Sequence, residues 1–277
     1  MKYLRPLKPL KAGRKMQIQG LQKLTLLDYP EKMAATVFTA GCNFRCPFCH
    51  NASLVTRIDT RYDIPVSDVM TFLKKRQNVL EGVCISGGEP LLQPDLEDFI
   101  KEVKSLGYLV KLDTNGSNLE KLQNLVEKSL IDYVAMDIKN APNKYAETIG
   151  LHEAINHEAM NVEKISSAGK NISSAKEDLK NNFNPEVMSQ VLATVDYLKS
   201  GVIPYEFRTT IVREFHKRED IEVIAKWLEG AEKYYLQEFV DSGDLIGEGF
   251  RAYTDEIMNQ ALEIVRKYVP EAKIRGT

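Results

Sequence analysis

A regular alternation of short apolar runs with amphipathic helical segments constrains the fold of this 277-residue chain most strongly. Six runs are rich in β-branched or aromatic side chains and are predicted strands, at 34–39, 82–86, 109–113, 133–137, 205–212 and 233–239. Segments with helical periodicity lie between these strands or after the last one, at 67–80, 94–107, 118–129, 185–200, 218–229 and 254–268. Repeated strand–helix units predict parallel strands joined by crossover helices.

The number of these units selects the architecture. A closed barrel of eight strand–helix units normally takes roughly 250 residues, whereas this chain offers six units. The strand segments are apolar on both faces, as parallel strands covered by helices require. We therefore predict an α/β fold, a partial (β/α)6 TIM-like barrel, over residues 16–277. In the clearest helix, 94–107, Asp95 is the expected N-cap and Gly107 closes the end.

Two stretches interrupt this pattern. Residues 1–15 carry six Lys or Arg, no acid and no apolar signal-peptide core, so we expect a basic flexible tail or an extension ahead of a start at Met16. Residues 152–186 are rich in Ala, Ser, Asn and Lys, and we expect a solvent-facing insertion there. His152 and His157 in that stretch are five apart, a poor spacing for a shared metal on one helical face.

Composition argues against several classes of protein. The net charge of −2 gives no general reason to expect nucleic acid or an anionic membrane as partner. No apolar run approaches the roughly 18 residues of a membrane span. Four unevenly spaced cysteines in a chain of this length do not resemble a disulfide framework. We therefore expect a cytoplasmic protein.

Three of the four cysteines fall in GCNFRCPFCHN, where Cys42, Cys46 and Cys49 are spaced C-x3-C-x2-C. This loop follows strand 34–39, at the carboxyl end, where barrel enzymes place their sites. Thiolates select zinc, copper(I) or iron–sulfur clusters, and structural zinc usually takes two separated C-x2-C pairs. Three ligands favour a [4Fe–4S] cluster with one iron open to a small molecule. Zinc and three structural thiols remain alternatives, and Cys84, inside an apolar strand, is expected to pack as a small hydrophobe.

Polar motifs follow three further strands: SGGEP at 86–90, LDTNG at 112–116 and YVAMDIK at 133–139. Each also has a plain structural explanation, as a βα turn, an Asn-Gly turn and charges that reach solvent. Asp137 and Lys139 are two apart and so share one side of a strand.

Three other residues need an interpretation. Arg208, inside strand 205–212, requires a buried partner, either an anionic ligand or a structural salt bridge. His216 lies on a loop and is expected to be solvated, and His50 is expected to support the neighbouring cysteines. The loop 236–250 is rich in Gly and Asp, but no chemical role follows from its sequence.

Taken in this order, the motifs resemble those of radical S-adenosylmethionine (SAM) enzymes, whose loop reads C-x3-C-x-Φ-C with an aromatic Φ, here Phe48. The resemblance implies a [4Fe–4S] cluster on Cys42, Cys46 and Cys49, with SAM bound to the fourth iron. It further implies SAM contacts at Phe48, Gly87, Gly88, Glu89, Asn115, Asp137, Lys139 and Arg208.

The DTNG and MDIK motifs are similar to those of glycyl-radical activating enzymes. That similarity implies a monovalent cation, Na⁺ or K⁺, beside SAM, held by Asp113, Thr114, Met136 and Asp137. The segment 20–51 most resembles the activating proteins of anaerobic ribonucleoside-triphosphate reductase.

The resemblance implies a radical SAM oxidoreductase. A flavodoxin or ferredoxin would reduce the cluster, SAM would be cleaved to methionine and a 5′-deoxyadenosyl radical, and the radical would take hydrogen from a glycine Cα of a large partner enzyme. The open side of a partial barrel would admit the partner's peptide loop. Activation of pyruvate formate-lyase or another glycyl radical enzyme, a radical SAM reaction on a small molecule, and a non-catalytic zinc-binding module are the alternatives.

Overall fold

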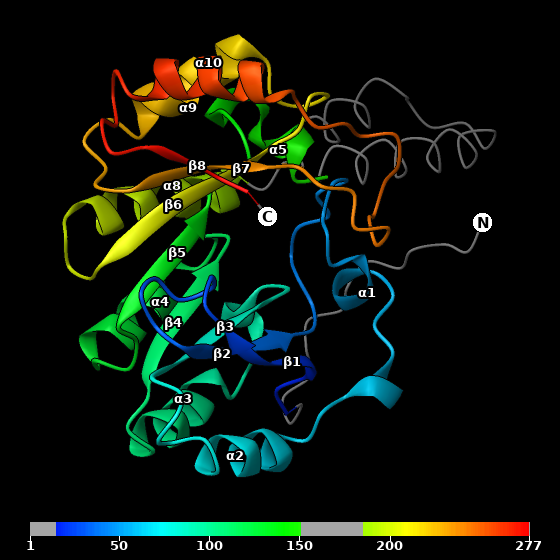
Figure 1. Cartoon of the computed structure of the whole chain (residues 1–277), viewed down its shortest axis with the longest axis vertical. Helices are drawn as coiled ribbons and strands as arrows, with labels where there is room; N and C mark the ends of the chain where they lie inside the picture. The colour runs from blue at the N-terminus through cyan, green and yellow to red at the C-terminus, as the bar shows by residue number, and fades with distance from the viewer. Residues whose placement is uncertain (1–14, 151–184, 277) are drawn as a thin grey trace, which may run out of the picture.

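The computed structural model describes residues 15–150 and 185–276, which form one curved sheet with helices outside it (Figure 1). Its eight strands follow one another across the sheet in chain order. They are β1 (Ile18–Thr25), β2 (Ala34–Thr39), β3 (Gly82–Gly87), β4 (Leu109–Thr114), β5 (Tyr133–Asp137), β6 (Tyr205–Ile211), β7 (Tyr234–Glu238) and β8 (Lys273–Arg275).

All six predicted helices are present, and each ends one to six residues before its predicted last residue. The helices of the described ranges are α1 (Ala52–Val55), α2 (Val66–Lys74), α3 (Leu96–Ser105), α4 (Leu119–Glu127), α5 (Tyr145–Thr148), α8 (Pro185–Lys199), α9 (Arg218–Trp227) and α10 (Asp255–Val265). Asp95 occupies the N-cap position of α3, but its side chain makes no capping hydrogen bond. Gly107 has φ +88° just beyond α3, a conformation that favours glycine.

The predicted partial α/β barrel is confirmed, with two additional strands at its edges. The strands β2 to β8 pair in parallel, whereas β1 runs antiparallel to β2, with Ile18 opposite Thr39. Only Ile18 and Thr25 are buried in β1, so this strand lacks the apolar run that marks the others. The strand β8 has three residues, too few to show a pattern.

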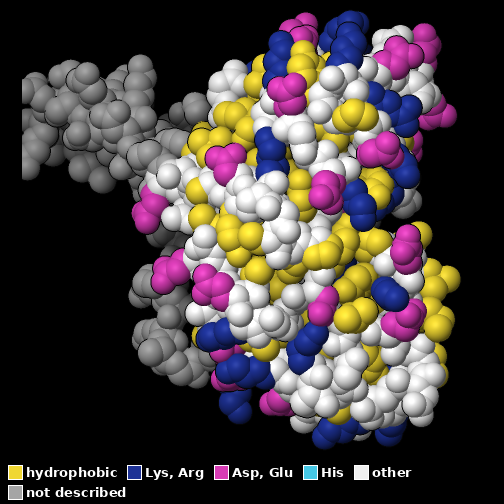
Figure 2. Space-filling view, turned by 90° about the vertical axis from the view of Figure 1, so that its left-hand side faces the viewer, with side chains coloured by type: hydrophobic (Ala, Val, Ile, Leu, Met, Phe, Trp, Pro, Cys, Tyr) yellow, Lys and Arg dark blue, Asp and Glu magenta, His cyan; other side chains and the backbone are white. Residues whose placement is uncertain are grey.

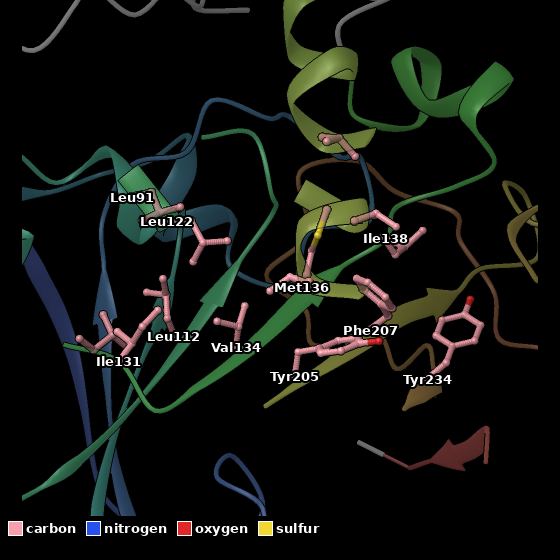
Figure 3. Close-up of a cluster of buried hydrophobic side chains, with 14 of the residues drawn as sticks. Leu91, Leu112, Leu122, Ile131, Val134, Met136, Ile138, Tyr205, Phe207 and Tyr234 are labelled. Carbon is pink, nitrogen blue, oxygen red and sulfur yellow. The ribbon is translucent and has the colours of Figure 1, made fainter. Parts of the chain in front are cut away.

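The two faces of the sheet differ. On β4, Val110 and Leu112 belong to the apolar core between the sheet and its helices. Leu112 lies there with Leu122 of α4 (Figure 3). The alternating residue Lys111 is fully buried, as is Glu206 on β6. Strands that are apolar on both faces were therefore a wrong expectation for β4 and β6, because their other side chains point inward and make buried ion pairs.

The predicted tail and insertion lie almost wholly outside the described residues, as do His152 and His157. Residues 185 and 186, assigned to the insertion, already belong to α8. No helix within the described ranges is long and apolar enough to cross a membrane. On the face drawn in Figure 2, Lys and Arg side chains are interspersed with Asp and Glu rather than gathered by sign.

Candidate active site

A cavity of about 160 Å³ lies where the loops leave the carboxyl ends of the parallel strands. That is many times the space that one water molecule needs. The thiols of Cys42, Cys46 and Cys49 all line it, together with the Phe48 ring. The tight loop predicted from the cysteine spacing thus brings its three thiols to one cavity.

The SGGEP turn is bound directly to the base of the cysteine loop. The Gly88 N–H donates to the Thr39 carbonyl, and the Glu89 N–H donates to the Gly41 carbonyl, both at 2.8 Å. A Cβ on Gly88 would lie 2.0 Å from the Gly41 oxygen. A Cβ on Gly87, whose φ is +106°, would lie 2.5 Å from the Thr39 backbone. Only glycine allows the two backbones to approach this closely.

The three thiols fit an iron–sulfur cluster, and one histidine lies beside them. Burial raises the pKa of Cys42 and of Cys46 to about 12, so these thiols become thiolates only when positive charge is brought to them. His50 lines the same cavity, and within the described residues its buried Nε2 atom has no hydrogen-bond partner. Three thiols around one cavity are a donor set suited to an iron–sulfur cluster. The His50 ring nitrogen is left to make a hydrogen bond beside them.

A single metal ion fits less well. In the described ranges, no three Cys, His, Asp or Glu side chains converge closely enough to hold one ion. Cys84 is fully buried on β3 and forms no part of the cavity wall.

The loop after β7 is bonded to the cysteine loop (residues 41–51) and to the α1 segment that follows it. The Asp244 carboxylate accepts hydrogen bonds from the Ser53 N–H (3.0 Å) and hydroxyl (2.7 Å) and pairs with Arg57. The Gly247 N–H donates to the Pro47 carbonyl at 2.7 Å. The sequence assigned no role to this loop, because its partners lie about 190 residues away along the chain.

The DTNG turn supplies the opposite wall, where Asp113, Thr114 and Asn115 line the cavity. The amide nitrogen of Asn115 lies 3.8 Å from the Cys42 sulfur. Glu89, in contrast, is 1% exposed and is not among the lining residues. Its carboxylate accepts from the Thr114 hydroxyl (2.9 Å) and the Asn115 N–H (2.7 Å), and burial raises its pKa to about 7. Glu89 therefore holds the DTNG turn in place without lining the cavity.

Charged residues complete the site at the end of β5. Asp137 and Lys139 line the cavity and form an ion pair at 2.9 Å. Arg208 lies behind them and donates to Asp137 at 2.9 Å and to Asp113 at 3.3 Å. Burial alone would raise the pKa of Asp137, but Arg208 and Lys139 hold it well below its usual range. The Met136 side chain is fully buried in the core, which leaves only its backbone near the site.

His216 contradicts its sequence-based interpretation as a solvated loop residue. It is 0% exposed, and its Nδ1 atom accepts a hydrogen bond from the Val212 N–H at 3.0 Å. Its Nε2 atom lies 2.8 Å from the Lys139 carbonyl, and its ring meets Phe48 edge-on at 6.0 Å. The side chain thus joins two elements of the site, which a lone histidine on a polar loop does not reveal.

Known proteins are similar to this chain in sequence. The family model of the radical SAM superfamily matches residues 36–228. A Methanocaldococcus jannaschii protein, named as a candidate glycyl-radical enzyme activating enzyme, is 30% identical over 265 residues, 94% of this chain and 96% of that protein. The pyruvate formate-lyase-activating enzyme of Clostridium pasteurianum is 25% identical over 248 residues, 81% of this chain and 98% of that protein.

A solved structure agrees with the fold. Streptococcus suis SuiB bound to S-adenosylmethionine superposes with a TM-score of 0.58 at 14% identity, over 85% of this chain and 48% of that chain. The superfamily implies a [4Fe–4S] cluster and SAM, and the matched residues include the three cysteines and every polar motif that lines the cavity. This chain therefore belongs to the radical SAM superfamily.

Proposed function

We propose that this protein is an activating enzyme that takes a hydrogen atom from a glycine Cα of a large partner, anaerobic ribonucleoside-triphosphate reductase. The observation that carries the proposal is the meeting of three thiols, the DTNG turn and the Asp137–Lys139 pair around one cavity. The full-length similarity to the Methanocaldococcus jannaschii protein supports the activating role.

In this proposal Cys42, Cys46 and Cys49 hold a [4Fe–4S] cluster. When bound, cluster and SAM together supply a reducing electron and a 5′-deoxyadenosyl radical that removes hydrogen. A flavodoxin or ferredoxin is the proposed electron donor. The chain binds and orients these groups, and orientation matters because an alkyl radical attacks whatever lies within contact range.

The SAM-binding residues divide into two groups. Phe48, Gly87 and Gly88 line the cavity beside the thiols, and Asn115 lies across from them. The glycines let the ligand approach the backbone closely, and the Asn115 amide offers hydrogen bonds. The Lys139 ammonium offers a positive charge to the carboxylate of SAM.

The second group is Arg208 and Glu89, which contact the lining residues but do not line the cavity themselves. Arg208 fixes Asp137, which in turn holds Lys139 in place. Glu89 fixes the backbone of the DTNG turn through Asn115. These two residues are proposed to position the residues that meet SAM, since neither is among those that line the cavity.

The open sheet suits a macromolecular substrate. Among the described residues, β1 pairs with β2 alone and β8 with β7 alone, and Figure 1 shows the two strands at separate edges of the sheet. A closed barrel would restrict access to small molecules, whereas this opening leaves a side for a peptide loop. The pyruvate formate-lyase-activating relative favours a second candidate partner, pyruvate formate-lyase.

Anaerobic reconstitution with iron, sulfide, reductant and SAM tests the proposal. We expect 5′-deoxyadenosine, and a glycyl radical signal by electron paramagnetic resonance when the reductase from the same organism is added. The matched control is the reductase with its target glycine changed to alanine. A radical on pyruvate formate-lyase alone would transfer the proposal to that partner, and 5′-deoxyadenosine without a radical on either would overturn the activating role.

A further inference from the structure

The carboxylates predicted to hold a monovalent cation already accept hydrogen bonds from cationic side chains of the protein. Asp113 accepts from Lys111 through one oxygen and from Ser86 (3.0 Å) and Arg208 (3.3 Å) through the other. Asp137 accepts from Arg208 through one oxygen and from Lys139 through the other, each at 2.9 Å. All four carboxylate oxygens therefore have protein donors.

The third predicted side-chain ligand, Thr114, is engaged too. Its hydroxyl donates to Glu89 at 2.9 Å and accepts from the Gly116 N–H at 3.1 Å. A cation at this place would have to share the hydroxyl oxygen with the Gly116 N–H. Protein donors therefore already serve the predicted ligands, which disfavours an added cation.

Charge balance leads to the same result. The two carboxylates face three cations, Lys111, Arg208 and Lys139, so these five side chains carry a net charge of +1. The nearby Glu206 carboxylate does not change this sum, because it is paired with Arg275. A further cation would raise that charge inside a largely buried site, where like charges repel strongly.

Lys111 supplies a positive charge directly beside Asp113. It comes from the middle of β4, is 0% exposed, and its ammonium meets Asp113 with the Cys84 sulfur 3.9 Å away. A buried lysine without a partner is strongly unfavourable, so Lys111 and Asp113 depend on each other. Its ammonium is close in size and equal in charge to a bound K⁺.

We propose that the Lys111 ammonium takes the place of a dissolved monovalent cation beside Asp113, so that this protein cleaves SAM without requiring Na⁺ or K⁺. The inference rests on the proposed SAM site and not on the choice of partner. It replaces the cation predicted from the DTNG and MDIK motifs. Removal of the ammonium should create a cation requirement where none exists.

Two variants and three salts test this. The apoprotein and the reconstituted enzyme are compared in NaCl, KCl and tetramethylammonium chloride at equal ionic strength, because the organic cation is too large for the site. For the natural chain we expect the same melting temperature and the same rate of 5′-deoxyadenosine formation in all three. For Lys111→Ala we expect the melting temperature and the rate to fall in tetramethylammonium and to recover in Na⁺ or K⁺. The recovery in rate should be about tenfold, a usual size for the coupling between two bound ligands.

The variant Lys111→Met removes the positive charge of Lys111 but leaves no empty volume for a cation. Its side chain fills the volume that the cation would enter, so we expect the loss without the recovery. Lys104→Ala is the matched control, because Lys104 forms an ion pair with Asp132 on the outside of the sheet at 2.8 Å. It should not make the protein sensitive to the choice of cation.

The outcomes are separable. A natural chain that loses SAM cleavage without Na⁺ or K⁺ overturns the inference, and so does a folded Lys111→Ala variant that ignores the cation in both assays. If Lys111→Ala is unfolded in every salt, the natural chain alone tests the inference. Its SAM cleavage should not depend on Na⁺ or K⁺, and a dependence would overturn the inference. Absence of SAM cleavage in all salts would instead refute the proposed function, and the melting temperatures of the apoprotein would still decide about the cation.

Discussion

Replacement of His216 by Asn or Gln should separate two hydrogen bonds that one ring now makes. The Asn amide reaches about as far as Nδ1, so its oxygen can still accept from the Val212 N–H. The Gln amide reaches about as far as Nε2, so its nitrogen can still donate to the Lys139 carbonyl. Each variant therefore keeps one contact and loses the other.

The size of the effect follows from burial. A buried hydrogen bond contributes about 1 kcal/mol net, and a buried polar group left without a partner costs about 1–3 kcal/mol. We expect either variant to lose about 2 kcal/mol of unfolding free energy. His216→Ala loses both bonds and the packing against Phe48, for about 3–5 kcal/mol.

The two variants should differ in SAM binding although they are similar in stability. Asn releases the Lys139 backbone and Gln does not. The loss of about 1 kcal/mol of positioning corresponds to about fivefold weaker SAM binding in His216→Asn. Denaturant unfolding of the apoprotein gives the stability, and the SAM dependence of 5′-deoxyadenosine formation gives the binding. Equal SAM dependence in the two variants would refute the positioning role.

The pH dependence provides an independent check. Burial lowers the pKa of His216 below 6.5. Its hydrogen bonds with the backbone of Lys139 and Val212 oppose this shift only in part. Below pH 6.5 the unfolded chain then binds a proton that the folded chain does not, so stability falls as the pH falls. His50 contributes in the same direction. Both variants should lose the His216 share of this slope, and an unchanged slope would contradict the buried neutral ring.

Other changes have equally direct consequences. Alanine at any of the three cluster cysteines should abolish iron loading and SAM cleavage, whereas Cys84→Ala should keep both and cost about 1 kcal/mol in denaturant unfolding; equal loss from Cys84→Ala in a folded protein would refute the ligand assignment. Gly88→Ala places a methyl group 2.0 Å from the Gly41 oxygen and should reduce iron loading, and unchanged loading would contradict the need for this close approach. Asp244→Asn should lower stability by about 1–2 kcal/mol through weaker bonds to Ser53, and an unchanged melting temperature would contradict this role of Asp244.

Local properties of the chain determined the parallel sheet and the position of the cysteine loop. Period-2 and helical patterns are set by near neighbours, and parallel strands place all their carboxyl ends at one edge. The strand ends that carry the cysteines, SGGEP, DTNG and Asp137 could therefore be predicted to meet. The edge strand β1 escaped prediction because an exposed edge needs no apolar run.

Only the tertiary structure decided what the buried polar side chains do. Lys111, His216 and Asp244 each occur in sequence contexts that equally describe exposed residues. His216 and Asp244 have partners 77 and 191 residues away along the chain. The partner of Lys111, Asp113, lies on the same strand, but the sequence of that strand does not show that both side chains are buried. A polar group is stable in the interior only when a partner meets it there, and that meeting is a property of the fold rather than of any local segment.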